Sequence, residues 1–370
     1  MRLLLIVNRV DEAHGLVRIV VFQTNYFIKH YGYEVELLIL DSKSRYKKAH
    51  YDISKKAKLN YFEAKGGFDF FNKVKFINSK INNISPDVIM VCVDHIFGLT
   101  LPYYIKKISP LIYQRHSTKS INIDRISRGW KVKLNNKIKQ ILISKAGVGY
   151  DSFVVLSEYH KKDWKHLKNI HVINNPVTID SFGETADLKA KTVVAIGRQD
   201  YVKGYDMLLD VWKKVQESHP DWKLEIYGKV NKSLCLEEKS KRLGLDQSIK
   251  FYNHTSNIKE VYLKSSILVC SSRIEGFPLV FIEAMSLGVP VISFDCPYGP
   301  RSIINHDEDG LLVEANNIDK MVESIEKLIT DEKTRKHYGK NAKVNANRFL
   351  PEKIYDQWDL LFKSVLKQND

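Results

Sequence analysis

Cysteine is scarce in this sequence, with four residues among 370. They are Cys92, Cys235, Cys270 and Cys296, and none forms a C-x-x-C motif or stands beside a pair of histidines. A zinc site or a disulfide framework needs closer spacing. We therefore expect reduced thiols in a cytoplasmic protein.

Long hydrophobic runs are also missing. No window approaches the roughly 18 to 20 uncharged apolar residues that a membrane-spanning helix needs. The opening "MRLLLIVNRVDE" has one positive charge ahead of a short apolar run. A secretory signal needs a longer apolar core and a small-residue cleavage site. We expect this stretch to be a buried first β-strand.

Two common nucleotide-binding motifs are absent as well. The sequence contains neither G-x-x-x-x-G-K-[ST] nor G-x-G-x-x-G. These motifs hold phosphates in P-loop NTPases and in dinucleotide-binding dehydrogenases. Their absence argues against both enzyme classes.

Acidic residues are scarce in only one half of the chain. Residues 1–180 hold 30 Lys and Arg against 15 Asp and Glu, whereas residues 181–370 hold 28 of each. The formal net charge of +15 therefore comes from the first half. A basic half beside a neutral half predicts two domains that face different partners.

What the sequence does contain is a repeated alternation of strand-like and helix-like segments. Continuous Val/Ile/Leu runs such as "RLLLIVN", "DVIMVCV" and "VPVISFD" are typical of parallel strands buried on both faces. The pattern restarts after Pro176 and a polar stretch that is typical of an interdomain linker. We predict an α/β protein with two Rossmann-like domains, residues 1–178 and 179–350. The last segment, 351–370, has the apolar stripe of an amphipathic helix.

The first strand of the second domain leads into "AIGRQDYVKGYDMLL". Ligands of doubly wound sheets bind at the carboxyl ends of the strands. Gly197 frees the backbone there, and Arg198 and Lys203 place two cations five residues apart before a helix. Cations beside the amides of a helix N-terminus suit a diphosphate. The alternative is that both are solvated surface cations.

A later strand-end loop, "SRIEGFP", carries Glu275, and Glu283 follows eight residues further on. Gly276 lets the backbone approach a ligand, and Pro278 suits the start of the helix "LVFIEAMSLG". Carboxylates at these positions could accept hydrogen bonds from paired sugar hydroxyls. The alternative is a capping Glu275 and a surface Glu283, but a carboxylate within an apolar run is costly unless it has a partner. The amides expected to point toward an anionic ligand are those of Phe277 and Leu279.

Three successive motifs resemble the signatures of family-4 retaining glycosyltransferases of GT-B architecture. They are "GRQDYVKGYDMLL", "SSRIEGFPLVFIEAMSLGVPVISFD" and "GPRSIINHDEDGLLV", and they include the E-x7-E spacing. The resemblance is strongest over 190–315, and "VVLSEYHKKDW" and "VINNPV" extend it. "DCPYGPRSII" resembles bacterial enzymes that build exopolysaccharide, O-antigen or lipid-linked glycans. The resemblance implies two parallel sheets facing a central cleft, with residues 351–370 crossing back onto the first domain.

The resemblance also implies roles for individual residues. Arg198 and Lys203 would hold the nucleotide diphosphate. Glu275 would bind the donor sugar and Glu283 the ribose. His116, which ends the strand "LIYQRH", matches a histidine that faces the donor sugar and the acceptor. The predicted catalytic residues are His116, Arg198, Lys203 and Glu275, and the predicted donor-binding residues are Gly15, Gly197, Arg198, Lys203, Gly228, Glu275, Gly276, Phe277, Leu279 and Glu283.

The sequence departs from the family pattern at three places. The first loop, "NRVDEAHG", lacks the usual Gly-Gly pair, so Gly15 stands in for it. Gly228 and Lys229 replace a Gly-acid-Gly turn, and Asn253 replaces a glycine. The last two changes fall near the expected base pocket.

The implied reaction is retaining transfer of a hexose or N-acetylhexosamine from a nucleotide sugar, UDP-linked on family grounds. The acceptor would be a lipid-linked or growing bacterial surface glycan. Arg and Lys at the phosphates would stabilise the departing diphosphate, so we expect neither a metal nor another cofactor. One enzymatic alternative is a GT-B sugar-nucleotide epimerase, which would release a changed sugar without an acceptor.

The basic charge is densest at residues 103–145, with eleven Lys and Arg against one acid, Asp124. Residues 125–142 can be drawn as an amphipathic helix, which would suit the anionic inner face of the cell membrane. The alternatives are a core helix with a solvated basic face, a docking site for a protein, or a nucleic-acid-binding stripe. No helix-turn-helix, RRM or zinc-finger pattern supports the last, so no nucleic-acid partner is expected. The apolar side would carry Ile126, Trp130, Leu134, Ile138, Ile141 and Leu142.

Overall fold

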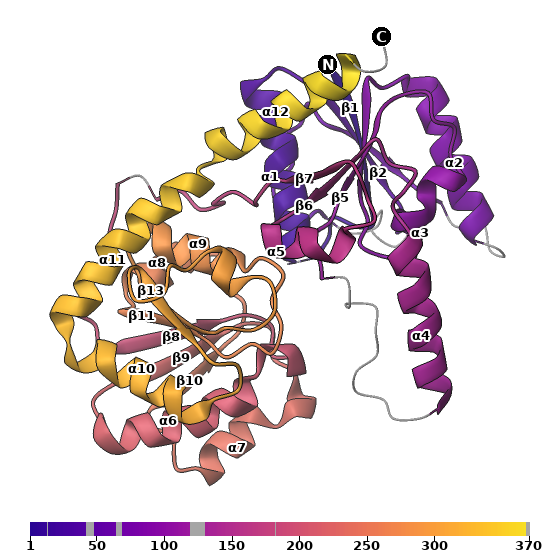
Figure 1. Ribbon diagram of the computed structural model, residues 1–370. Helices are drawn as coiled ribbons and strands as arrows, with labels where there is room; N and C mark the ends of the chain where they lie inside the picture. Colours follow the sequence, from indigo (N-terminus) through magenta and orange to yellow (C-terminus); the bar gives the residue numbers. More distant parts are fainter. Residues whose placement is uncertain (13, 42–47, 64–68, 119–129, 182, 368–370) are drawn as a thin grey trace. The chain divides into compact units, whose positions relative to one another are not determined.

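The computed structural model describes the chain apart from residues 13, 42–47, 64–68, 119–129, 182 and 368–370. Its internal contacts divide it into two compact units (Figure 1). Unit 1 comprises Met1–Thr178 together with Pro351–Asp370, and unit 2 comprises Ile179–Leu350. Each unit has one sheet of parallel strands covered by helices, which confirms the predicted α/β class with two Rossmann-like domains.

The strands of unit 1 are β1 (Arg2–Val7), β2 (Glu34–Ile39), β3 (Lys58–Tyr61), β4 (Val88–Cys92), β5 (Leu111–Gln114), β6 (Ser152–Val155) and β7 (Ile170–Val172). They form a seven-stranded sheet in the order β3-β2-β1-β4-β5-β6-β7. Both faces of β1 are buried, because Leu3 and Leu5 belong to one apolar cluster and Leu4 and Ile6 to another. Burial on both faces explains why this strand appears in the sequence as an unbroken apolar run.

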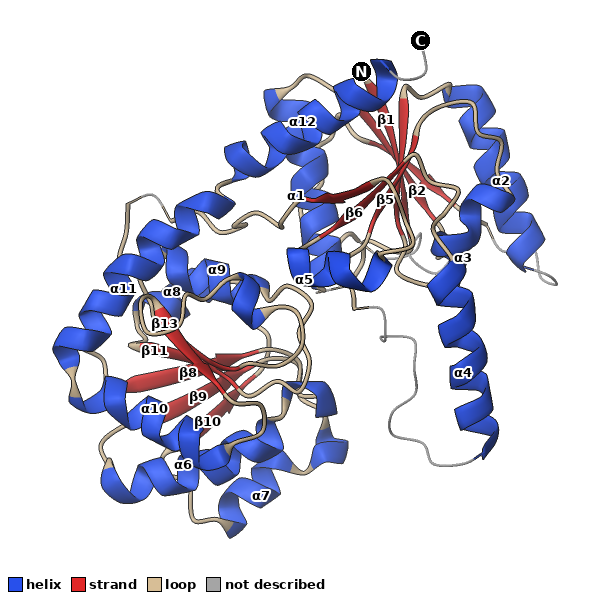
Figure 2. Cartoon of the chain, viewed as in Figure 1, coloured by secondary structure: helices blue, strands red, loops and turns tan. Residues whose placement is uncertain are grey.

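The helices of unit 1 are α1 (Gly15–His30), α2 (Asp69–Ile84), α3 (Ile96–Thr100), α4 (Trp130–Lys145), α5 (Glu158–Lys161) and α12 (Pro351–Lys367). α1 and α12 pack on one face of the sheet, and α2 and α3 pack on the other (Figure 2). Although α12 is the last helix of the chain, it lies beside α1 (Figure 1). Tyr31 donates a hydrogen bond to Asp356 at 2.5 Å, and the ring of Phe27 packs edge-on against Tyr355.

The strands of unit 2 are β8 (Thr192–Ile196), β9 (Lys223–Tyr227), β10 (Ile249–Tyr252), β11 (Ile267–Cys270), β12 (Val291–Phe294) and β13 (Gly310–Val313). The sheet order is β10-β9-β8-β11-β12-β13. The helices are α6 (Tyr205–Ser218), α7 (Leu236–Arg242), α8 (Ile258–Leu263), α9 (Leu279–Ser286), α10 (Ile318–Thr330) and α11 (Glu332–Ala346). α6, α7 and α10 cover one face of the sheet, and α8 and α9 lie over the other (Figure 2).

The strand order reverses between β1 and β4 in unit 1 and between β8 and β11 in unit 2. At such a switch point the connections leave toward opposite faces of the sheet, so the carboxyl ends of the two strands open a crevice where ligands bind. In unit 2 these ends lead into the two loops that the sequence analysis singled out, after Ile196 and after Cys270.

One strand is not predicted by the sequence. β3 lies between β2 and α2, in a stretch that lacks the continuous apolar run of the other strands. It is four residues long, exposed or half-buried throughout, and pairs with β2 at the edge of the sheet. Edge strands of this kind carry polar residues, which leaves no apolar run to detect.

The structure contradicts the core-helix alternative for the basic segment. α4 extends away from the sheet of unit 1 (Figures 1 and 2). Leu134, Ile138, Ile141 and Leu142 on its outer surface are between 48% and 51% exposed, whereas Ile143 is buried. Residues 125–129 of the predicted helix lie outside the described residues. Among the helices described, none has the length and apolar composition that a membrane crossing requires.

Candidate functional site

The loops that follow β8 and β11 approach each other closely at the switch point of unit 2. Ser271 Oγ donates a hydrogen bond to the backbone oxygen of Lys203 at 3.0 Å. Gly204 ends a 3-10 turn over Tyr201–Lys203 and has a φ of +65°. A Cβ at this position would lie 2.1 Å from the backbone oxygen of Ser271. This position therefore requires glycine both for its left-handed backbone and for the close approach.

A charged pair, Lys203 and Glu275, joins the two loops. Lys203 Nζ lies 2.7 Å from Glu275 Oε1, and Ser272 Oγ donates to the same oxygen at 2.6 Å. The side chains of Lys203 and Glu275 are 22% and 10% exposed. Burial opposes the charge on Lys203, but the carboxylate of Glu275 outweighs it and raises the pKa of Lys203. The site thus holds a permanent ammonium against a carboxylate, and the solvated-cation alternative is wrong for Lys203.

Arg198 differs from Lys203 in its surroundings. Its side chain is 60% exposed and forms an ion pair with Asp200 at 3.2 Å. Asp200 also accepts a hydrogen bond from the backbone N–H of Lys203 at 3.1 Å, so it caps the turn between the two cations. The cation pair predicted from the sequence therefore consists of one half-buried charge held by Glu275 and one exposed charge.

Gly197 and Gly228 bring the ends of β8 and β9 into contact. A Cβ on Gly228 would lie 1.9 Å from the Gly197 oxygen, so no larger residue fits there. Gly197 N–H donates to Tyr227 O at 2.9 Å, which continues the β8–β9 ladder into the loops. Both predicted glycines thus shape the backbone next to Arg198.

Glu283 is buried, which contradicts the surface alternative. It lies in the second turn of α9, is 1% exposed, and accepts a hydrogen bond from Tyr262 of α8 at 3.1 Å. The two predicted carboxylates therefore lie in different settings. Glu275 faces a cation, whereas Glu283 is held by a phenol.

Residues 276–279 connect Glu275 to α9. Pro278 occupies the N-cap position, just before the first turn. The side chain of Phe277 is buried and packs edge-on against Phe349 at 5.6 Å, so this side chain serves the core of unit 2. Glu275 is further fixed by its backbone oxygen, which accepts from Gly299 N–H at 3.0 Å.

Two of the predicted residues, His116 and Gly15, belong to unit 1. His116 follows β5, and its backbone N–H donates to Asp94 Oδ1 at 3.1 Å. Its Nε2 is buried and has no hydrogen-bond partner among the described residues. Burial lowers the pKa of His116 to about 4, so the imidazole is neutral at neutral pH. Gly15 is the first residue of α1, next to the capping side chain of His14.

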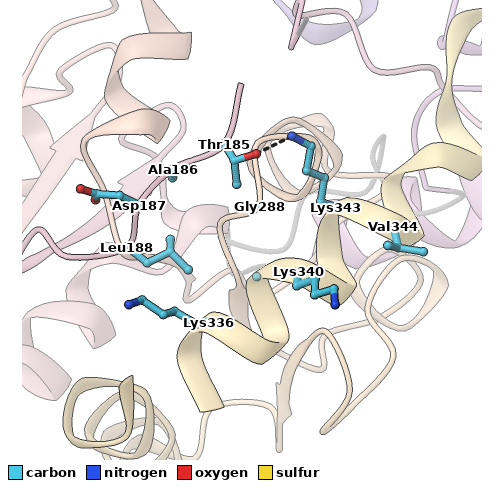
Figure 3. Close-up of a pocket in the computed structure, with 10 residues that line it drawn as sticks. Thr185, Ala186, Asp187, Leu188, Gly288, Lys336, Lys340, Lys343 and Val344 are labelled. Atoms are coloured by element: carbon cyan, nitrogen blue, oxygen red, sulfur yellow. Dashed lines mark hydrogen bonds between the residues drawn. The ribbon is translucent and has the colours of Figure 1, made fainter. Parts of the chain in front are cut away.

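A groove elsewhere in unit 2 is separate from these residues (Figure 3). Leu188 and Gly288, which line it, precede β8 and β12, so it opens at the amino edge of the sheet. Lys343 in its wall is already bonded to Thr185 Oγ1 and to the backbone oxygens of Gly183 and Glu184. Ligands of doubly wound sheets bind at the opposite edge.

Two further acidic residues of unit 2, Asp307 and Asp309, lie just before β13. Asp307 bonds to Lys327 at 2.7 Å, and Asp309 accepts from the backbone N–H of Asn305 at 2.9 Å. These carboxylates therefore serve local structure. In the described part of the chain, no three His, Cys, Asp or Glu side chains are grouped so as to hold a metal ion.

Several residues that hold the site were not predicted. Ser272 and Tyr262 bond directly to Glu275 and Glu283, and Arg273 ties the two loops together. Ser272 and Arg273 lie within the "SSRIEG" stretch, and their closeness to Glu275 in sequence was the available signal. No sequence signal links Tyr262 to Glu283, because the two residues lie on different helices.

Comparison with known proteins identifies one family. Residues 177–345 match the family model described as glycosyl transferases group 1. The chain is 34% identical over 211 residues to an uncharacterized glycosyltransferase of Haemophilus influenzae, spanning 56% of this chain and 60% of that protein. It is 27% identical over 370 residues to the amylovoran biosynthesis glycosyltransferase AmsD of Erwinia amylovora, spanning 97% of this chain and 98% of that protein.

The fold is also similar to that of a solved glycosyltransferase. TarM of S. aureus, determined as a mutant in complex with Fondaparinux, alpha-GlcNAc-glycerol and UDP, gives a TM-score of 0.81. The match covers 98% of this chain and 99% of that chain at 16% sequence identity, so the likeness is one of fold. Residues 177–345 are therefore similar to glycosyl transferases group 1, and the chain as a whole shares the fold of TarM.

Proposed function

We propose that this chain is a retaining glycosyltransferase that moves a hexose or N-acetylhexosamine from a UDP-sugar to a lipid-linked or growing bacterial surface glycan. The observation that carries the proposal is the Lys203–Glu275 pair at the carboxyl edge of the unit 2 sheet. A nucleotide-sugar donor needs a cation for its diphosphate and an acceptor for its sugar hydroxyls, and this pair supplies both.

Sugar transfer passes through an oxocarbenium-like state in which negative charge develops on the departing diphosphate. Lys203 would stabilise that charge from a fixed position, and the exposed Arg198 has room to close over the phosphates. Glu275 would bind donor hydroxyls near the reacting carbon, and Glu283 would bind the ribose. Because two cations would oppose the diphosphate, we propose that transfer needs no divalent metal.

Unit 1 would bind the acceptor, with His116 at the carboxyl edge of its sheet. A neutral imidazole with a pKa of about 4 is a weak base but a good hydrogen-bond partner. We therefore assign His116 the orientation of a substrate hydroxyl rather than the removal of its proton.

Two related proteins support the choice of substrates. AmsD is named for the biosynthesis of amylovoran, and the TarM complex contains UDP and alpha-GlcNAc-glycerol. The name of AmsD and the ligands of TarM both point to glycosyl transfer. They favour this function over that of an epimerase or a nucleic-acid-binding protein.

The first test is ligand-induced thermal stabilisation by UDP, GDP, ADP and their hexose conjugates, each with magnesium and with EDTA. A ligand at 100 times its Kd stabilises the folded state by about 2.7 kcal/mol. We expect a shift with uridine ligands that is the same with magnesium and with EDTA. No shift with any nucleotide contradicts the donor site. Sugar changed and released without an acceptor would identify the epimerase instead.

We also propose that α4 docks unit 1 on the anionic inner face of the cell membrane. Leu134, Ile138, Ile141 and Leu142 recur at helical spacing and are about half exposed. Eleven Lys and Arg lie in residues 103–145, ten of them besides the buried Arg115, and each well-placed basic residue contributes roughly 1 kcal/mol at an anionic surface. Apolar burial and charge attraction would act together on this helix.

Vesicle co-sedimentation tests this docking. We expect binding to phosphatidylglycerol-containing vesicles that falls with salt, and loss of that binding in Leu134→Glu/Ile138→Glu. Val344→Glu is the matched control, because Val344 is also an exposed apolar side chain on a helix, but in unit 2. Equal binding to neutral vesicles, or preferential binding to RNA oligonucleotides, would contradict the proposal.

A further inference from the structure

Arg273 belongs to the loop after β11 but bonds to the loop after β8. Its backbone N–H donates to Val202 O at 2.8 Å, and Nη1 donates to Tyr201 O at 2.6 Å. Its guanidinium also forms two hydrogen bonds with Asp206 in the first turn of α6, at 2.9 and 2.6 Å. The Tyr201 ring lies 4.0 Å from the guanidinium carbon, within cation–π range.

The bonded segment, Tyr201–Asp206, contains Lys203. Arg273 binds the two residues before Lys203 and a residue after it, while Ser271 bonds to the backbone oxygen of Lys203 itself. The Arg273 loop also carries Glu275 two residues later. These contacts therefore hold the backbone around Lys203 against the loop that carries Glu275.

A paired guanidinium and carboxylate contribute little to stability when exposed, and half of the Asp206 side chain is exposed. Their two-bond geometry nevertheless fixes orientation as well as distance, which lysine cannot do in place of arginine. The Arg273–Asp206 pair therefore fixes the orientation of the two segments and adds little to the free energy of unfolding.

We propose that Arg273 and Asp206 form a positioning clamp that keeps Lys203 and Glu275 in register while the donor reacts. The clamp is assigned no contact with the donor and would act through those two side chains. This inference rests on the proposed glycosyltransferase function. A misplacement of about 1 Å at a reacting centre costs on the order of 100-fold in rate, so a small loosening of the loop is expected to affect kcat.

The clamp is first tested without any donor, by hydrogen–deuterium exchange of the full chain. We expect amides of residues 201–207 to exchange about tenfold faster in Arg273→Ala and in Arg273→Lys. Lys327→Ala is the matched control, since Lys327 also pairs with a carboxylate and an aromatic ring in unit 2, but beside β13. Unchanged exchange in the Arg273 variants would overturn the clamp whatever the donor proves to be.

The second test is a kinetic cycle with Lys203→Ala. If the clamp acts through Lys203, Arg273→Ala lowers kcat roughly tenfold or more in the parent and much less in the Lys203→Ala background, with KM for the donor changing little. If the effects of Arg273→Ala and Lys203→Ala on kcat are additive, the clamp does not act through Lys203. A wild-type chain without transfer activity would contradict the proposed function, and the exchange measurement would still decide the clamp.

Discussion

At the scale of single residues, the candidate site consists of charges placed in unequal surroundings. Lys203 and Glu275 are largely buried and paired with each other, whereas Arg198 is exposed and pairs with Asp200. A buried pair is expensive to break, because the remaining charge loses its partner and cannot reach water. Substitutions at Lys203 and at Arg198 should therefore have different consequences, although both residues are proposed to bind the same diphosphate.

Lys203→Ala and Arg198→Ala should separate stability from binding. Both variants should weaken UDP binding, about tenfold or more each. Lys203→Ala should in addition lower the free energy of unfolding by a few kcal/mol, because it leaves Glu275 buried without its cation. Arg198→Ala should leave stability within about 0.5 kcal/mol. Urea unfolding and UDP titration of both variants check this, and unchanged UDP affinity in both would contradict the phosphate role.

Glu275→Gln should reduce turnover while largely preserving UDP affinity. Glutamine keeps an oxygen that can accept from Ser272 and Lys203, so the loop should keep its shape. It loses the negative charge proposed to act on the donor sugar, and we expect kcat to fall on the order of 100-fold. Steady-state kinetics and UDP titration are the measurements, and normal turnover would contradict the assigned role.

At the scale of elements, the proposed binding groups lie on two kinds of segment. Lys203 and Glu275 lie in loops that follow strands, whereas Glu283 and its partner Tyr262 lie on helices. The sequence predicted the strands and the two loops of unit 2 because each is a local signal, an apolar run followed by glycine and charge. The pairing of Lys203 with Glu275 spans 72 residues, and that of Tyr262 with Glu283 joins two helices. Such pairings leave no periodic trace in a single sequence, so they appear only once the strands are aligned in a sheet.

The helix after β6 carries a titratable residue that should make unit 1 sensitive to acid. His160 in α5 is buried, and burial together with the charge of Arg115 lowers its pKa to about 4. Between pH 6.5 and 4 the unfolded chain therefore binds a proton that the folded chain does not, and stability falls as the pH falls through this range. The loss should reach about 3 kcal/mol for His160.

Comparing His160→Gln with the parent chain by urea unfolding at pH 7 and pH 4.5 tests this. The parent should lose more stability than the variant between the two pH values. His116, with a pKa also lowered to about 4, remains in both chains and contributes equally to both. An equal loss in the two chains would contradict the low pKa of His160.

At the scale of the whole molecule, the two units are built differently along the chain. Unit 2 is one continuous segment, Ile179–Leu350, whereas unit 1 needs both ends of the chain. The sequence predicts an amphipathic helix in residues 351–370, but helical spacing alone does not identify the partner of its apolar stripe. In the structure that stripe, with Ile354, Trp358 and Phe362, completes the apolar cluster of unit 1.

Expressing the segments separately tests this difference. Residues 179–350 should unfold cooperatively and be stabilised by UDP. Residues 1–178 should bind a hydrophobic dye, because Phe27 and its neighbours lack the cover of α12. Joining residues 351–370 to them through a flexible linker should abolish dye binding. A compact, dye-free 1–178 segment would contradict the need for α12.

The position of α12 also sets an order of events during synthesis. The ribosome releases the strands of unit 1 first, but α12, which covers one face of their sheet together with α1, emerges only after all of unit 2. Domains fold as they emerge, so unit 2 can be finished while unit 1 still exposes apolar side chains that chaperones recognise. A truncated mRNA that ends before the codon for residue 351 would therefore yield a chain in which unit 2 can fold completely and unit 1, although synthesised first, cannot.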